Sequence, residues 1–201
     1  MTFIDSYKVP IVITILLLAI SFGYFYYLTP HESVVGDIHI HGDFKVFLNG
    51  AAYNFSQSKY MSDENHSLNP FFHVHDNDGE VMHQHISGVN IGTFFRSLNM
   101  TLNSTCFVLD NGTRYCTNSQ RSLKMYVKHS GKSWQKTNDF GAYSLTDLDQ
   151  ILISYGNESE DQINWQMSQV TDRACIQSEK CPERGSPHDE STCAGTGPCK
   201  A

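Results

Sequence analysis

Six of the ten histidines in the chain occur in three His-x-His pairs, namely His39/His41, His73/His75 and His83/His85. On a β-strand, residues i and i+2 point to the same face, so each pair presents two imidazoles side by side. Imidazole suits zinc and copper, and the ligand type alone does not separate the two metals. The pattern therefore predicts a zinc or copper site whose ligands are His39, His41, His73, His75, His83 and His85.

The loop between the second and third pairs decides whether they meet. A three-residue loop, Asn77-Asp78-Gly79, places His73 opposite His83, and all four histidines then share one face. A two-residue loop would put the two pairs on opposite faces. We expect the longer loop, because it places the apolar residues that alternate with the histidines together on the other, core-facing side of the sheet. These residues are Phe72, Val74, Met82 and Ile86. Six histidines exceed the four ligands of one tetrahedral zinc, so either two sites exist or some histidines support the others.

Acidic residues lie close to these pairs. Residues 76–80 (DNDGE) place side-chain oxygens at alternating positions and could hold calcium, but they lack the full calcium-loop pattern, so an ordinary acidic turn is the stronger prediction. Asp43, Asp76 and Glu80 are the only evident candidates for a general base beside the histidines. The sequence assigns no catalytic residue.

The first residues of the chain differ from the rest. Residues 1–8 form a short polar end, and residues 9–28 (VPIVITILLLAISFGYFYYL) carry no charge. About twenty such residues span a hydrocarbon core of roughly 30 Å, and tyrosines end the segment as in an aromatic belt. A cleaved signal peptide would have a shorter apolar region followed by a small-x-small site, and no such site directly follows residue 28. We predict a transmembrane anchor in contact with the lipid bilayer, followed by a linker over residues 29–37.

Two features place the remainder outside the membrane. All six cysteines follow the anchor, as do six Asn-x-Ser/Thr sequons, at Asn54, Asn65, Asn99, Asn103, Asn111 and Asn157. Disulfides and N-glycans belong to oxidising, extracytoplasmic compartments. The alternative for the sequons is a polar surface rich in Asn and Ser. We therefore expect a single-pass cell-membrane glycoprotein whose C-terminal part is extracytoplasmic.

The outer part reads as a His-rich domain over residues 38–157 and a helix with a Cys-rich tail over residues 158–201. Short strands surround one helix that Asn90 can cap, and a second helix can begin at Asn157. This order predicts an α+β fold, a small β-grasp-like mixed sheet with one crossing helix, with a β-sandwich as the alternative. A net charge of -7 argues against a nucleic-acid partner.

The cysteines predict disulfides. A three-residue turn over residues 110–112 sets Cys106 opposite Cys116, close enough for a cross-strand bridge. Cys175, Cys181, Cys193 and Cys199 allow three pairings, of which two local bridges are the simplest, and a tetrathiolate zinc knuckle is an alternative with unusual spacing. No Cys-x-x-Cys occurs, which argues against a thioredoxin-type dithiol.

Several blocks resemble a family of short, membrane-anchored archaeal proteins of no established activity. The blocks are HGDFKVFLNG, FHVHDNDGEVMHQHISGVNIGTFFRSL, LDQILISYGN and ACIQSEKCPERG, and they extend over about residues 38–199. Some members of that family carry a label of protein disulfide isomerase, for which this chain, without Cys-x-x-Cys, offers no chemical support.

The most direct functional hypothesis is an extracytoplasmic metal-binding module, acting as a metal relay or as an accessory subunit of a larger membrane complex. A metal-dependent enzyme is the second hypothesis, because a histidine-bound metal with an open position can activate water. A glycosylated structural surface protein is the third, and a disulfide isomerase-like protein is the weakest.

Overall fold

In a computed structural model of the protein, residues 14, 17–21, 24, 37–62 and 68–187 are described. The chain divides into two compact units, residues 1–35 and residues 36–201. The described residues of the first unit are helical, and within the described parts of the chain no helix is long and apolar enough to cross a bilayer. Most of the predicted anchor at residues 9–28 lies outside the described residues, as do residues 1–8 and 29–36.

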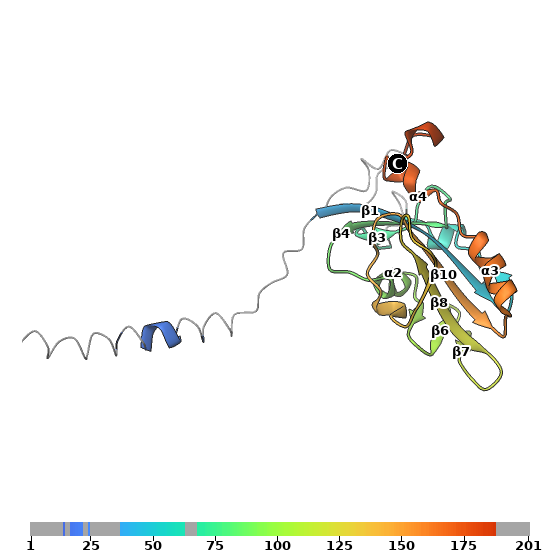
Figure 1. The fold of residues 1–201 in the computed structure, drawn as a ribbon, viewed down its shortest axis with the longest axis horizontal. Helices are drawn as coiled ribbons and strands as arrows, with labels where there is room; N and C mark the ends of the chain where they lie inside the picture. The colour runs from blue at the N-terminus through green and yellow to red at the C-terminus, as the bar shows by residue number, and fades with distance from the viewer. Residues whose placement is uncertain (1–13, 15–16, 22–23, 25–36, 63–67, 188–201) are drawn as a thin grey trace, which may run out of the picture. The chain divides into compact units, whose positions relative to one another are not determined.

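A seven-stranded mixed sheet forms the centre of the second unit (Figure 1). Its parallel central pair joins β1 and β10, and every other neighbouring pair is antiparallel. The predicted α+β class with a mixed sheet is confirmed. The strand order is β3 (Phe72–His73), β4 (Val81–Ile86), β1 (Asp37–Leu48), β10 (Asp149–Gly156), β8 (Ser122–Lys128) and β9 (Gln135–Thr137), while β2 (Ala51–Ala52) pairs with the end of β1.

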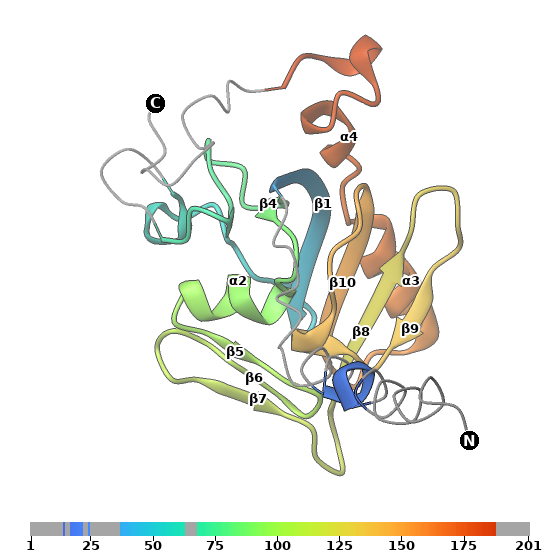
Figure 2. The same cartoon turned by 90° about the vertical axis from the view of Figure 1, so that its left-hand side faces the viewer.

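One face of this sheet carries the main hydrophobic core. Strand residues alternate in direction, so Phe44 and Val46 of β1 lie on the same side as Ile151 and Ile153 of β10. Helix α2 (Ile91–Ser97) packs on this face through Phe94 and its neighbours, and the Asn90 side chain caps it as predicted, accepting from Thr93 N–H. Figure 2 shows α2 beside a second, three-stranded sheet of β5 (Thr101–Leu102), β6 (Cys106–Val108) and β7 (Arg114–Cys116).

The opposite, outer face is covered by the C-terminal part of the chain. Helix α3 (Glu160–Ser168) buries Ile163 against Phe47 and Leu152 of the sheet. The prediction that Asn157 caps this helix is wrong, because Ser159 forms a capping box with Gln162. Helix α4 (Ala174–Gln177) then contacts β1. Three short 3₁₀ turns complete the described elements: η1 (Ser58–Tyr60), η2 (Phe140–Ala142) and η3 (Pro182–Arg184).

Two disulfides are present in the described part of the chain. Cys106 pairs with Cys116 across β6 and β7, in the predicted register and with Gly112 in the left-handed conformation at a φ of 82°. Cys175 pairs with Cys181, one of the local bridges left open by the sequence, so these two sulfurs are not thiolate ligands of a zinc knuckle. Cys193 and Cys199 lie outside the described residues.

Candidate metal centre

The sheet brings the three His-x-His pairs together on its outer face. Strand β4 lies between β3 and β1, and His83 is in register with His73 on one side and with His41 on the other. The predicted pairing of His73 with His83 is confirmed. Phe72, Val74 and Met82 are buried in the main core on the other face, which explains why the histidines face outward.

The loop between β3 and β4 differs in detail from the predicted three-residue turn. Regular pairing ends at His73, and the left-handed residues are Asp76 and Asn77, at φ of 54° and 58°, not Gly79. Gly79 instead lies against the backbone of Phe55, where a Cβ would approach a carbonyl carbon to 2.2 Å. The wider loop leaves the register of the histidines unchanged.

The six imidazole rings form one continuous cluster, which we call the histidine cluster: His39, His41, His73, His75, His83 and His85. His83 lies at its centre, with ring centroids 4.7 Å from His41, 6.1 Å from His73 and 3.9 Å from His75. These four residues are at most 5% exposed. His39 is exposed and His85 is half-buried, at the outer end of the cluster.

Two of the buried histidines are oriented by oxygen atoms close to them in the sequence. His73 Nδ1 donates to the carbonyl of Asn69 at 2.8 Å, and His75 Nδ1 donates to the carboxylate of Asp76 at 2.7 Å. Donation through Nδ1 leaves Nε2 as the nitrogen through which each ring would bind a metal. With its Nδ1 donating to Asp76, His75 accepts a hydrogen bond at Nε2 from His83 Nδ1, at 3.2 Å.

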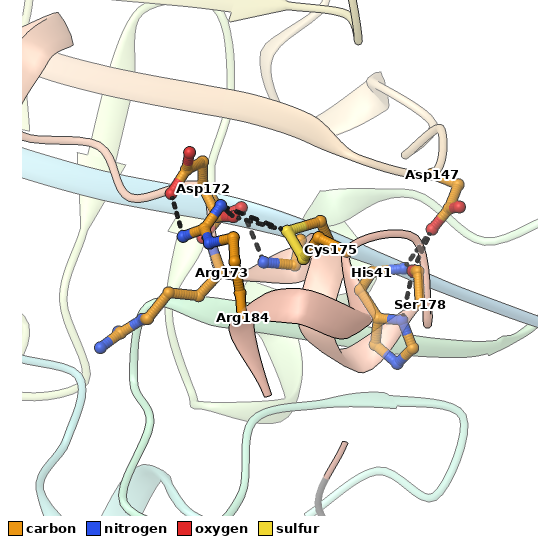
Figure 3. Close-up of a disulfide and its surroundings, with 10 residues drawn as sticks. His41, Asp147, Asp172, Arg173, Cys175, Ser178 and Arg184 are labelled. Carbon is orange, nitrogen blue, oxygen red and sulfur yellow. Dashed lines mark hydrogen bonds and ion pairs between the residues drawn. A yellow bond between two sulfur atoms is a disulfide. The ribbon is translucent and has the colours of Figure 1, made fainter. Parts of the chain in front are cut away.

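His41 is oriented by the C-terminal tail (Figure 3). Ser178 Oγ donates to Asp147 Oδ1 at 2.5 Å, so it accepts from His41 Nδ1 at 2.7 Å. Asp147 Oδ1 also accepts the backbone N–H of His41 at 3.1 Å. Ser178 and Asp147 carry no motif that marks them, and only the fold places them beside His41. Histidine orientation by an outer oxygen is the usual accompaniment of metal ligation.

The acidic residues near the cluster have protein partners. Asp78 and Glu80 accept from the Arg173 guanidinium at 2.7 Å and 3.2 Å, and Glu80 also pairs with Lys45. The oxygens considered for calcium are therefore used by ion pairs and by His75. As the side chains stand, no group of three His, Cys, Asp or Glu residues within the described ranges is arranged to hold a metal ion.

Asp43 has a structural role distinct from the general base considered above. Its buried carboxylate accepts from Thr171 Oγ1 and from the backbone N–H groups of Arg173 and Ala174, at 2.5, 2.8 and 3.0 Å. Burial raises the pKa of Asp43, and these hydrogen bonds oppose the rise. Asp43 thus attaches the tail that carries Ser178 to the outer face of the sheet.

Comparison of the chain with family models, with curated proteins and with solved structures found no match. The chemistry of the histidine cluster therefore carries the functional argument.

Proposed function

We propose that the protein is a membrane-anchored, extracytoplasmic metal-binding protein that holds zinc or copper in the histidine cluster. It would act as a metal relay or as an accessory subunit of a larger membrane complex. The observation that carries the proposal is the packing of three His-x-His pairs, from three strands, into one continuous set of imidazole rings.

The spacing of the rings supports this proposal. Metal–nitrogen bonds of about 2.0–2.1 Å at tetrahedral angles separate two ligand nitrogens by roughly 3.3 Å and two ring centroids by about 5 Å. His75 Nε2 and His83 Nδ1 are 3.2 Å apart, and the centroids of His41 and His83 are 4.7 Å apart. As the side chains stand, no three such groups within the described residues are arranged to hold an ion, so we expect metal binding to require rotation of some of these imidazoles.

Burial divides the cluster into two parts with different expected roles. His41, His73, His75 and His83 are shielded from water, so a metal bound there would be held tightly by neutral imidazoles. His39 lies at the exposed end, with its ring 4.9 Å from that of His85. We infer that the exposed His39 receives a metal ion, which then passes to the buried histidines of the cluster.

The location outside the membrane has two supports. Disulfides persist in oxidising compartments, and two are present among the described residues. All five sequon asparagines that the structure describes are exposed, as a glycan would require: Asn54, Asn99, Asn103, Asn111 and Asn157. The anchor at residues 9–28 is proposed from the sequence alone.

We also infer a β-grasp-like architecture for the sheet domain, with α2 as the crossing helix. The central strands of the order β4-β1-β10-β8 are parallel, and they are the first and the last strand of this sheet along the chain. Helix α2 lies in the chain between the pair β1 and β4 and the pair β8 and β10. Both features support a β-grasp-like fold over the β-sandwich alternative.

The test is elemental analysis of the full-length chain, purified from an oxidising compartment after growth with zinc or copper. We expect one or two metal ions per chain in the parent protein and loss of metal in His83→Ala, because His83 contacts three other histidines of the cluster. His129→Ala is the matched control, because His129 lies outside the cluster and pairs with Asp149. A metal-free parent protein, or equal metal in parent and His83→Ala, would overturn the proposal.

A further inference from the structure

The Cys175–Cys181 disulfide closes a short loop that lies against the histidine cluster (Figure 3). The loop holds α4 from its second residue onward and Ser178, whose hydroxyl orients His41. Asp43 attaches the start of this segment to the sheet at Arg173 and Ala174. The part of the loop after Ser178 includes Glu179, a non-glycine residue in the left-handed conformation at a φ of 54°. The disulfide at Cys181 links this part to Cys175 at the start of the loop. Ser178 also donates from its backbone N–H to the Ala174 carbonyl at 2.9 Å and from its hydroxyl to Asp147, so the disulfide acts on its position together with these two hydrogen bonds.

The surroundings of this disulfide favour attack by a thiolate. Arg184 Nη1 lies 3.3 Å from Cys175 Sγ while Nη2 of the same guanidinium pairs with Asp172 at 2.7 Å. Cys175 also lines an open pocket of about 270 Å³, together with the cations Lys128 and Arg184 and the carboxylates of Asp43 and Asp172. Cys181 is buried. The Arg184 guanidinium, in direct contact with Cys175 Sγ, can stabilise the negative charge that spreads over the sulfurs during exchange.

We propose that the Cys175–Cys181 disulfide is a thiol-sensitive switch on the histidine cluster. Reduction by a small thiol releases Ser178 from His41 and weakens metal binding. This inference rests on the proposed metal-binding function and names a regulation of that same site.

The chemistry is ordinary thiol–disulfide exchange. The attacking thiolate forms a bond to Cys175 Sγ, the Cys175–Cys181 bond breaks, and Cys181 leaves as a thiolate that takes a proton from water. A second molecule of the same thiol, as thiolate, attacks the sulfur of the first, and Cys175 leaves as a thiolate beside Arg184. Two thiols are oxidised to one disulfide and the protein disulfide is reduced to two thiols.

The release of Ser178 then affects His41, the proposed metal ligand that Ser178 orients. Loss of the Ser178 hydroxyl removes a hydrogen bond from His41 Nδ1 and weakens the orientation that presents Nε2 to a metal. Loss of such an orienting partner lowers metal affinity about 10- to 100-fold in metalloproteins.

The first part of the test needs no metal. The full-length chain is treated with cysteine at fixed pH, and each cysteine is alkylated and followed by mass spectrometry. We expect Cys175–Cys181 to open faster than Cys106–Cys116, which serves as the internal control, and Arg184→Gln to slow the opening about threefold to tenfold. Equal rates for the two disulfides, or an unchanged rate in Arg184→Gln, would overturn the proposal.

The second part measures Zn(II) affinity by competition with a chromophoric chelator. The variant Cys175→Ser/Cys181→Ser opens the loop without adding thiolate ligands, and Ser178→Ala removes the hydroxyl while the disulfide stays closed. We expect each to bind Zn(II) at least about tenfold more weakly than the parent chain, and the triple variant to be no weaker than either. Ser168→Ala, which removes an exposed hydroxyl on α3, should leave affinity unchanged.

The outcomes separate the two proposals. Parental affinity in both Cys175→Ser/Cys181→Ser and Ser178→Ala overturns the switch and leaves the metal site in place. Absence of Zn(II) and copper from the disulfide-closed parent chain overturns the proposed function itself. Because Ser178→Ala keeps the disulfide, a folding defect of the double serine variant does not remove the test.

Discussion

Replacement of Asp43 by alanine should detach the tail from the sheet without unfolding the sheet. The carboxylate accepts three hydrogen bonds, from Thr171, Arg173 and Ala174, and its side chain is buried. Each hydrogen bond to a charged group contributes about 1.5–3 kcal/mol. Burying the carboxylate costs free energy, which offsets part of the stabilisation from these three hydrogen bonds. The same burial raises the pKa of Asp43. We therefore work with a net loss of about 3 kcal/mol for the docked tail.

Native-state hydrogen exchange resolved by residue is the appropriate assay. A loss of about 3 kcal/mol predicts roughly a 100-fold fall in the protection of the Arg173 and Ala174 amides, while amides of β10 keep their protection. Asp78→Ala is a matched control, because it removes a half-exposed ion pair to the same Arg173 and should change protection less than about fivefold. If Asp43→Ala altered these amides no more than Asp78→Ala, the assignment of Asp43 as the tail anchor would be refuted.

Three further predictions concern stability. Gly79→Ala should destabilise the domain by about 2–4 kcal/mol in chemical denaturation, because its Cβ would lie 2.2 Å from the Phe55 backbone, whereas Gly88→Ala meets no atom within 4 Å and should cost about 1 kcal/mol for its left-handed φ. Similar losses at the two sites would contradict the close approach. The Lys59 ammonium lowers the pKa of Asp110, so the folded state gains stability that is present above the unfolded pKa and is lost as the pH falls through the folded pKa. Asp110→Asn should therefore show a shallower loss of stability below about pH 4, and a parallel decline in parent and variant would contradict this linkage. Ser159→Ala should lower the unfolding free energy by about 1 kcal/mol by removing the cap of α3, and a change near zero would mean that the capping box contributes nothing.

The sequence by itself determined the features that depend on a few adjacent residues. Alternation along a strand put the two members of each His-x-His pair on one face. Turn chemistry at Gly112 set one hairpin and aligned Cys106 with Cys116. The same alternation predicted the register of His73 with His83, because the apolar side of β3 and β4 had to face the core.

Local sequence patterns did not fix the exact start of helix α3 or the exact shape of the loop between β3 and β4. Asn157 and Ser159 are both good caps, and the capping box formed with Gln162 decides for Ser159. The loop between β3 and β4 is wider than a standard turn because Gly79 packs against a distant backbone segment, and turn rules do not include that contact.

Only the tertiary structure decided how distant segments complete the candidate site. The pairing of β1 with β4 places His41 beside His83, and no local rule sets the register of strands so far apart in the chain. The tail then brings Ser178 to His41 across 137 residues and gives Asp43 its role as an anchor. Hydrogen bonds of this kind depend on the packing of the whole outer face, so the sequence could supply the histidines of the candidate site but not the groups that orient them.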